Sequence, residues 1–310
     1  RPRSCVWTAK LGRSLLIYAV VPYLAVVAIF TLFQRRLIYQ PTRQASLRAA
    51  DFGLAPTAAR DVQMTAEDGL TLHGWLLFAD QPAHNPRAPD DVRTSEQLVI
   101  YFPGNAGHRG YRTSDFLEFT RQGLDVLIFD YRGYGENPGA PSEPAMQADA
   151  RAACRFAREE LGADPSRIVL FGESMGGAVA IALAAEMCEQ GTPPSALITN
   201  ATFASLAETV KWHYPWFPFQ FVLRDRWPSV QRIPHVTCPV LMFHGARDDI
   251  VPFSQGRELF AAVPSASTSG RPKQFVELPA NGHNDIPVSL LDEELHAFLP
   301  AVLPRTPVAD

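Results

Sequence analysis

Short apolar runs alternate with longer stretches of helical periodicity through most of this chain. The apolar runs lie at residues 98–102, 126–130, 168–171, 196–199, 240–243 and 275–278. The helical patterns between and after them cover residues 111–122, 142–161, 176–190, 253–263 and 288–299. Strands that are apolar on both faces are typical of a parallel sheet buried between helices. The pattern therefore predicts an α/β fold.

Two more strands are predicted ahead of these six. Residues 61–65 and 70–78 flank Asp68-Gly69, and an Asp-Gly pair between apolar runs is typical of a hairpin turn. Together the runs predict an eight-stranded, mostly parallel sheet within a domain covering residues 60–300. Residues 80–96 are polar and contain three prolines, which predicts a mobile surface loop.

An uncharged apolar stretch covers residues 14–33. At about 1.5 Å per residue, a helix of this length spans a hydrocarbon layer of ~30 Å. The stretch is apolar on all sides, unlike a core helix, and no small-x-small cleavage site follows it, unlike a secretory signal. We therefore expect a single transmembrane anchor, with an N-terminal tail at residues 1–13 and a juxtamembrane connector at residues 34–59. Four basic residues lie on each side, so the sequence leaves the membrane orientation open.

Composition and charge narrow the possible partners. The chain has 310 residues, a net charge of −4 and scattered basic residues, which argues against a surface for nucleic acid. The four cysteines, Cys5, Cys154, Cys188 and Cys238, lack Cys-x-x-Cys spacing and are interpreted as small buried hydrophobic residues. Zinc-ligand spacings are also absent from the sequence, so we expect neither a metal nor an organic cofactor. Residues 301–310 are expected to form a C-terminal tail.

A serine lies on a glycine-rich turn between a predicted strand and a predicted helix. The turn reads Gly172-Glu173-Ser174-Met175-Gly176-Gly177. A serine hydroxyl is a weak nucleophile at neutral pH, and a sharp turn of this kind lifts it to where a base can reach it. We predict that Ser174 is a nucleophile and that the backbone N–H of Met175 forms part of an oxyanion hole. Glu173 is interpreted mainly as a packing residue.

A base and an acid follow two later strands. Asp248 lies in a turn after residues 240–243, and Asp249 would replace it if the strand register shifted by one residue. His283 follows the last strand in a short loop, and we predict that it is the general base, with Asp248 as its acid. His244 is interpreted as structural. The loop after residues 98–102 offers a second oxyanion donor, the backbone N–H of Asn105.

Aromatic residues are concentrated in residues 204–238, after the sixth strand, where we expect a small cap. We name Trp212, Trp216 and Phe217 as candidate substrate contacts, forming an apolar wall for an acyl chain. The alternative is that these rings pack within the cap itself.

Taken together, the chain resembles the α/β-hydrolase superfamily, and more closely its membrane-anchored branch of α/β-hydrolase-domain proteins. The resemblance covers about residues 37–299. Besides the three predicted catalytic residues it rests on four motifs: Leu37-Ile38-Tyr39-Gln40-Pro41, Gly104-Asn105-Ala106-Gly107, Asp130-Tyr131-Arg132-Gly133-Tyr134-Gly135 and the run from His244 to Pro252. Pro103 departs from the family, in which histidine usually precedes the oxyanion glycine.

The resemblance implies a serine hydrolase that cleaves an ester or thioester, with a small-molecule or lipid-like acyl substrate. A peptidase or amidase on the same fold is an alternative, and so is a non-catalytic binding protein. A dehydrogenase is a further alternative, because Gly104, Gly107 and Gly110 follow a strand and Asp130 ends the next. Their spacing does not match the dinucleotide-binding motif, however, and that interpretation leaves Ser174 unexplained.

Overall fold

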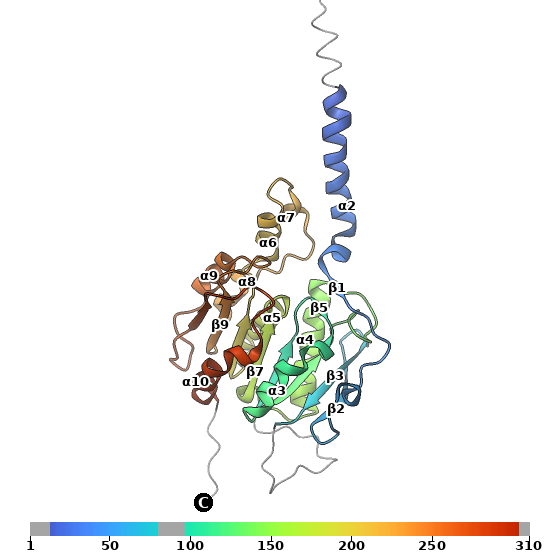
Figure 1. Ribbon diagram of the computed structural model, residues 1–310. Coiled ribbons are helices and arrows are strands. Elements are labelled where there is room, and N and C mark those ends of the chain that lie inside the picture. The colour runs from blue at the N-terminus through green and yellow to red at the C-terminus, as the bar shows by residue number, and fades with distance from the viewer. Residues whose placement is uncertain (1–12, 80–96, 304–310) are drawn as a thin grey trace, which may run out of the picture.

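The computed structural model describes residues 13–79 and 97–303, and a large sheet flanked by helices forms its centre (Figure 1). The strands of this sheet are β2 (Ala59–Thr65), β3 (Thr71–Leu77), β4 (Leu98–Phe102), β6 (Asp125–Phe129), β7 (Ile168–Glu173), β8 (Ala196–Asn200), β9 (Val240–Gly245) and β10 (Gln274–Leu278). Their order is β10-β9-β8-β7-β4-β6-β3-β2. β3 is antiparallel to its neighbours β2 and β6, and the other pairs are parallel. The predicted eight-stranded, mostly parallel α/β fold is confirmed.

Helices cover both faces of the sheet, as its apolar central strands require. Every residue of β4, β6 and β8 is buried. The helices around the sheet are α3 (Thr113–Arg121), α4 (Glu143–Glu159), α5 (Met175–Glu189), α9 (Phe253–Ala262) and α10 (Asp292–Val302). α3 and α10 share one hydrophobic cluster with the sheet, and α4, α5 and α9 share the other.

Two helix predictions need correction at their starts. The pattern at 111–122 becomes a 3₁₀ turn, Arg109–Arg112, followed by α3, and the pattern at 288–299 becomes the 3₁₀ turn Val288–Leu291 followed by α10. In both cases the first turn is wound more tightly than an α-helix, and hydrophobic periodicity alone does not distinguish the two kinds of helix.

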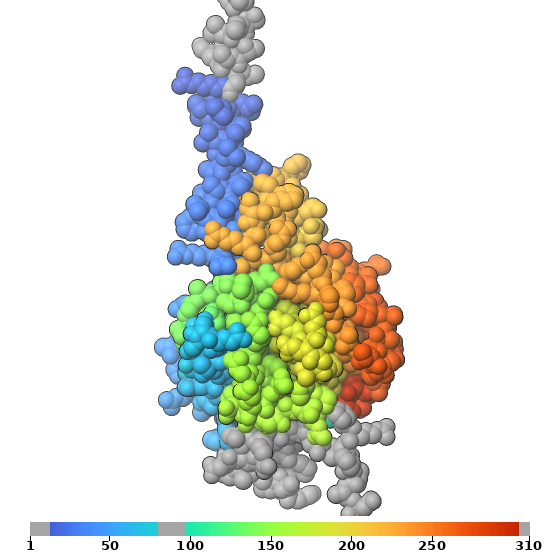
Figure 2. Space-filling model, turned by 180° about the vertical axis from the view of Figure 1, so that it is seen from behind, coloured from blue at the N-terminus to red at the C-terminus, as the bar shows by residue number. Residues whose placement is uncertain are grey.

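The N-terminal apolar segment is helical, as predicted, but it is longer than expected. A π-helical turn at Leu16–Val20 leads into α2 (Val21–Ile38), which stands out from the domain (Figures 1 and 2). The prediction that a connector begins at residue 34 is wrong, because side-chain contacts of Gln34 and Arg35 with the cap hold the last turns of the helix. After the helix, β1 (Gln40–Pro41) pairs in parallel with β5 (Ala106–Gly107), and a 3₁₀ turn follows at Ala49–Phe52.

The expected cap, residues 204–238, contains only short helices. These are α6 (Leu206–His213), α7 (Phe219–Val222) and α8 (Ser229–Arg232). Ser205 caps α6 by accepting hydrogen bonds from the N–H groups of Ala207 and Glu208. α6 and α7 lie beside the lower half of α2 (Figures 1 and 2).

Several predictions fall wholly or partly outside the described residues. These are the loop at 80–96, the N-terminal tail up to residue 12 with Cys5, and the C-terminal tail from residue 304. Of the other cysteines, Cys154 and Cys238 are buried, as predicted, whereas Cys188 is only partly buried, and all three are free thiols.

Candidate active site

Ser174 lies at the sharp turn between β7 and α5. Its φ of 53° and ψ of −115° are unusual for a residue with a side chain. The turn is held by a hydrogen bond from the Ser174 N–H to the Asn200 carbonyl, 2.8 Å away. A Cβ atom on Gly176 would lie 2.0 Å from the carbonyl oxygen of Phe102, so only glycine lets α5 start this close to β4. The predicted elbow geometry is therefore present.

The structure brings the three predicted catalytic residues into one chain of hydrogen bonds. His283 Nε2 lies 3.0 Å from Ser174 Oγ, and His283 Nδ1 lies 2.7 Å from Asp248 Oδ2. The three residues come from loops after β7, β9 and β10, which are 35 to 109 positions apart in sequence. An imidazole held between a serine and a carboxylate is suited to accept the serine proton.

Asp248 is fixed as a charged group beneath the histidine. Its Oδ1 atom accepts hydrogen bonds from the N–H groups of Ile250 and Val251 at 2.9 and 2.7 Å. Burial alone would raise its pKa, but hydrogen bonds with His244, His283 and Val251 hold the pKa of Asp248 well below its ordinary value. Asp249, the alternative acid, is exposed, and the contact with His283 is made by Asp248.

From the sequence, His244 was interpreted as structural, and in the structure this residue contacts the carboxylate of Asp248. It is buried, and its Nε2 atom lies 3.3 Å from Asp248 Oδ2 and 2.9 Å from the Val251 carbonyl. The carboxylate of Asp248 thus lies between two imidazoles. The sequence placed His244 near the end of β9, four positions before Asp248, but it gave no sign that the three residues between them turn the two side chains toward each other.

The two residues predicted for the oxyanion hole follow the neighbouring parallel strands β4 and β7, Asn105 after β4 and Met175 after β7. Met175 is the first residue of α5, where helix N–H groups have no partner within the helix. The Asn105 side chain does not face the reaction: its Nδ2 donates to the Ile38 carbonyl at 2.6 Å, and its Oδ1 accepts from Tyr134 Oη at 2.8 Å and Gln40 N–H at 3.3 Å. These bonds tie the loop after β4 to the end of α2.

Glu173 next to the serine is neutralised by an ion pair. Arg112 donates from Nε and Nη2 to the two carboxylate oxygens at 2.7 and 2.9 Å, and Tyr101 Oη donates a third bond at 3.1 Å. A Cβ atom on Gly104 would lie 3.0 Å from Glu173 Oε1, so this pair also packs against the loop after β4. The interpretation of Glu173 as a packing residue is consistent with these contacts.

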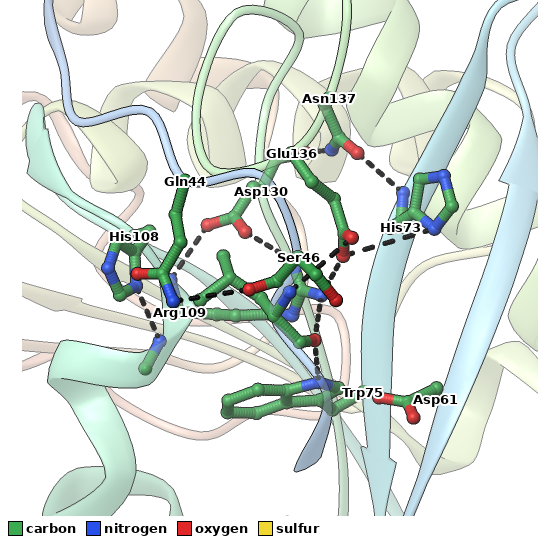
Figure 3. A network of polar contacts seen from close by, with 12 residues as sticks. Gln44, Ser46, Asp61, His73, Trp75, His108, Arg109, Asp130, Glu136 and Asn137 are labelled. Atoms are coloured by element: carbon green, nitrogen blue, oxygen red, sulfur yellow. Dashed lines mark hydrogen bonds and ion pairs between the residues drawn. The ribbon is translucent and has the colours of Figure 1, made fainter. Parts of the chain in front are cut away.

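A polar network centred on the buried Arg109 follows the loop after β4 in the chain (Figure 3). Arg109, in the turn after β5, is almost fully buried and pairs with Asp130 at the end of β6 and with Glu136. Its Nη2 donates to the Leu47 carbonyl at 2.6 Å, and Trp75 Nε1 donates to the same oxygen at 3.0 Å. With its carboxylate held by Arg109, Asp130 is not available as the ribose ligand of a dinucleotide site.

The three aromatic residues predicted as substrate contacts lie at the outer end of the cap. Trp212 and Trp216 are exposed, and Phe217 stacks on Tyr23 of α2 with ring centroids 5.2 Å apart. In the described part of the chain, Trp212 contacts the ring of His213, and Phe217 stacks on Phe219 as well as on Tyr23. Within residues 13–79 and 97–303, no group of three or more histidine, cysteine or acidic side chains is suited to hold a metal ion.

Comparisons with known proteins agree with this architecture. A family model described as serine aminopeptidase, S33, matches residues 93–231. An uncharacterized protein of Mycobacterium tuberculosis is 40% identical over 278 residues, which cover 89% of this chain and 90% of that protein. The lysophosphatidylserine lipase ABHD12 of Danio rerio is 30% identical over 251 residues, covering 74% of this chain and 65% of the lipase.

Solved structures share the fold. An alpha-beta hydrolase from Vibrio vulnificus aligns with a TM-score of 0.63 at 20% identity, covering 79% of this chain and 81% of that one. The sheet order, the serine elbow and the relatives lead to the same assignment. The chain belongs to the α/β-hydrolase superfamily, in its ABHD-like branch, and is a hydrolase.

Proposed function

We propose that this protein is a membrane-anchored serine hydrolase that cleaves an ester or thioester of a lipid-like acyl group. The observation that carries the proposal is the hydrogen-bonded chain from Ser174 through His283 to Asp248. Ester hydrolysis is also supported by relatives that are named as lipases, such as ABHD12. No cofactor is needed for this reaction.

The reaction begins with proton transfer within this chain. His283 Nε2 accepts the proton of Ser174 as Oγ attacks the acyl carbonyl carbon. Asp248 holds the ring with Nδ1–H toward its carboxylate and stabilises the imidazolium. His283 then protonates the leaving alcohol or thiol, which departs and leaves an acyl group on Ser174. Water, deprotonated by His283, attacks this acyl-enzyme, and the collapse of the second tetrahedral intermediate returns the proton to Ser174.

Negative charge on the attacked carbonyl oxygen needs two donors, and the backbone N–H groups of Met175 and Asn105 are proposed for this role. Met175 is favoured because it starts α5, where the helix dipole also stabilises negative charge. Asn105 is favoured because its side chain is occupied with Ile38, Gln40 and Tyr134, which fixes the backbone of the loop beside the serine.

Membrane anchoring through the N-terminal helix is part of the proposal. Residues 13–38 form a helix long and apolar enough to cross a bilayer, and its side chains outside the cap contact are mostly exposed. An anchor next to the active site favours a substrate that lies in the membrane. The side of the membrane on which the domain lies stays open.

The full-length protein in detergent or nanodiscs provides the test. We expect it to hydrolyse nitrophenyl esters from acetyl to palmitoyl and to react with a fluorophosphonate probe, and Ser174→Ala should lose both activities. Ser166→Ala is a matched control, because Ser166 is exposed and precedes the other end of β7. If folded wild-type protein neither turns over esters nor takes the probe, serine catalysis is refuted and a non-catalytic binding protein becomes the leading hypothesis.

A peptidase or amidase activity is the second candidate, because the matching family model is described as a serine aminopeptidase. An aminopeptidase needs a free carboxylate to bind the substrate ammonium group, and the carboxylate next to Ser174, that of Glu173, is already paired with Arg112. Aminoacyl nitroanilides assayed beside the esters separate the two activities. Faster turnover of the anilides would replace the esterase assignment.

A further inference from the structure

The outer end of the cap carries a surface unlike the rest of the domain. Residues 212–223, which we call the cap tip, contain no Asp, Glu, Lys or Arg. Four large aromatic side chains in it are exposed, and Trp216 and Phe221 are 85% and 74% exposed. A run of exposed aromatic residues without charges is typical of a surface that contacts protein or lipid.

The cap tip packs along α2 and not only at its base. Phe219 stacks on Phe30 with centroids 4.0 Å apart, and Phe217 stacks on Tyr23 at 5.2 Å. Tyr23 Oη also donates a hydrogen bond to the Trp216 carbonyl at 3.1 Å. Figure 2 shows the cap against the lower half of the helix, with the upper half free. The exposed apolar surface of α2 therefore continues onto the cap tip.

Polar contacts mark where this shared apolar surface ends. Arg35 donates from Nε and Nη2 to the two oxygens of the buried Asp225, both at 2.9 Å, and Gln34 bonds the Val222 carbonyl and the Arg224 N–H. Arg36 and Arg224 are exposed at the same level. With Leu32, Phe33 and Arg43 they line a cleft of about 630 Å³ that combines apolar and cationic side chains.

The helix then sets the depth of the cap tip. Tyr23 precedes Arg35 by 12 positions, so the two lie about 18 Å apart along a helix that rises 1.5 Å per residue. Half of a hydrocarbon layer of ~30 Å is about 15 Å. If the arginines lie at the lipid headgroups, the contact between Tyr23 and the cap tip lies near the middle of the bilayer.

We propose that the cap tip is a second membrane element, inserted beside α2 into the leaflet nearest the domain. Its occupant is the lipid leaflet itself: acyl chains cover Trp216 and Phe221, and the phosphates of the headgroups meet Arg36 and Arg224 in the cleft. Acyl substrates then reach the cap by lateral movement in the leaflet. This inference takes from the proposed function only that α2 spans a membrane.

Tryptophan quenching in nanodiscs tests the insertion without using catalysis. In a Trp7→Phe/Trp212→Phe variant of the full chain, Trp216 is the one exposed tryptophan, since Trp75 and Trp227 are fully buried. We expect lipids brominated on the acyl chains to quench this variant far more than the triple variant that also carries Trp216→Phe. Equal quenching of the two variants would overturn the proposal.

A second experiment asks whether insertion matters for substrate access. Phe221→Glu puts a charge into the leaflet and should lower hydrolysis of a palmitoyl ester in nanodiscs by about tenfold or more, because a carboxylate is unfavourable in hydrocarbon. That tenfold loss corresponds to about 1.4 kcal/mol. Hydrolysis of the soluble acetyl ester should stay within about twofold of wild type, because the substitution changes no catalytic contact. Leu290→Glu, which replaces an exposed apolar residue away from the cap, in the turn before α10, is the matched control.

The outcomes separate this inference from the proposed function. Quenching without ester hydrolysis in wild type would keep the insertion and refute the catalytic role of Ser174. Hydrolysis with no specific quenching, or a Phe221→Glu variant equal to Leu290→Glu on both esters, would refute the insertion alone.

Discussion

The side chain of Asn105 offers a sharp test of how the oxyanion loop is held. It makes three hydrogen bonds, to the Ile38 carbonyl at 2.6 Å, Tyr134 Oη at 2.8 Å and the Gln40 N–H at 3.3 Å. The two short bonds are each worth about 1 kcal/mol net, and the long one contributes less. Asn105→Ala should therefore weaken the reactive conformation of the loop by about 2 kcal/mol.

This free energy sets the size of the kinetic effect. Since 1.36 kcal/mol corresponds to tenfold in rate, a loss of about 2 kcal/mol limits the fall in kcat to roughly 30-fold, and we expect five- to 30-fold. KM for a short ester should change little, because the side chain faces away from the substrate. Tyr134→Phe, which removes one of the short bonds, should lower kcat by about fivefold.

Steady-state kinetics on nitrophenyl acetate measures both parameters, with Gln44→Ala as the control. Gln44 carries an exposed amide in the segment after β1, where it donates to the Ser46 carbonyl, and its loss should leave kcat unchanged. An Asn105→Ala variant with wild-type kcat would refute the idea that this side chain positions the loop. A fall of 10³-fold or more would mean that the side chain itself binds the oxyanion, since single donors there contribute about 10²–10³.

Three further outcomes follow from the site. Asp248→Asn should lower kcat by about 10⁴-fold without unfolding the protein, which circular dichroism and ester kinetics would show together. The pKa of Asp248 is lower in the folded protein than in the unfolded chain, so its carboxylate stabilises the fold above the unfolded pKa of about 4, and this stabilisation is lost as the pH falls below that value. Asp248→Asn should therefore reduce the difference between the unfolding free energies at pH 6 and at pH 3. Arg109→Met leaves Asp130 buried without its guanidinium and should destabilise the fold by about 3–5 kcal/mol, seen as a lower Tm, with partial recovery in Arg109→Met/Asp130→Leu. An unchanged pH difference, or a Tm equal to wild type, would contradict the respective prediction.

The sequence was most informative where a local pattern carries the geometry. The central strands of the sheet are continuous apolar runs, and the turn around Ser174 needs glycine at fixed positions because α5 starts against β4. The loops holding Asp248 and His283 could be found because each directly follows a strand. Parallel strands place such loops at one edge of the sheet, so residues far apart in sequence were expected to meet.

The contacts between α2 and the cap had no comparable signal. Asp225 is buried and charged, but its partners Arg35 and Tyr39 lie 190 and 186 positions away, and nothing near Asp225 in sequence distinguishes it from a surface acid. Gln34 is similar, since a single amide at the end of an apolar helix is usually solvated. This is why the helix was expected to end at residue 33, and why the cap aromatics were interpreted as an acyl-chain wall or as rings packed within the cap but not as partners of α2.

These contacts also give a physical meaning to the motif Leu37-Ile38-Tyr39-Gln40-Pro41. The Ile38 carbonyl and the Gln40 N–H hold Asn105, β1 pairs with β5 in the oxyanion loop, and Tyr39 Oη donates to Asp225 in the cap at 3.1 Å. Trp227 Nε1 donates to the same Tyr39 oxygen at 3.2 Å. Four consecutive residues, 38–41, thus join the end of α2 to the cap and to the loop after β4. A helix that served only as a tether would need none of these bonds, so the end of α2 is better understood as a structural part of the active site than as a linker to the membrane.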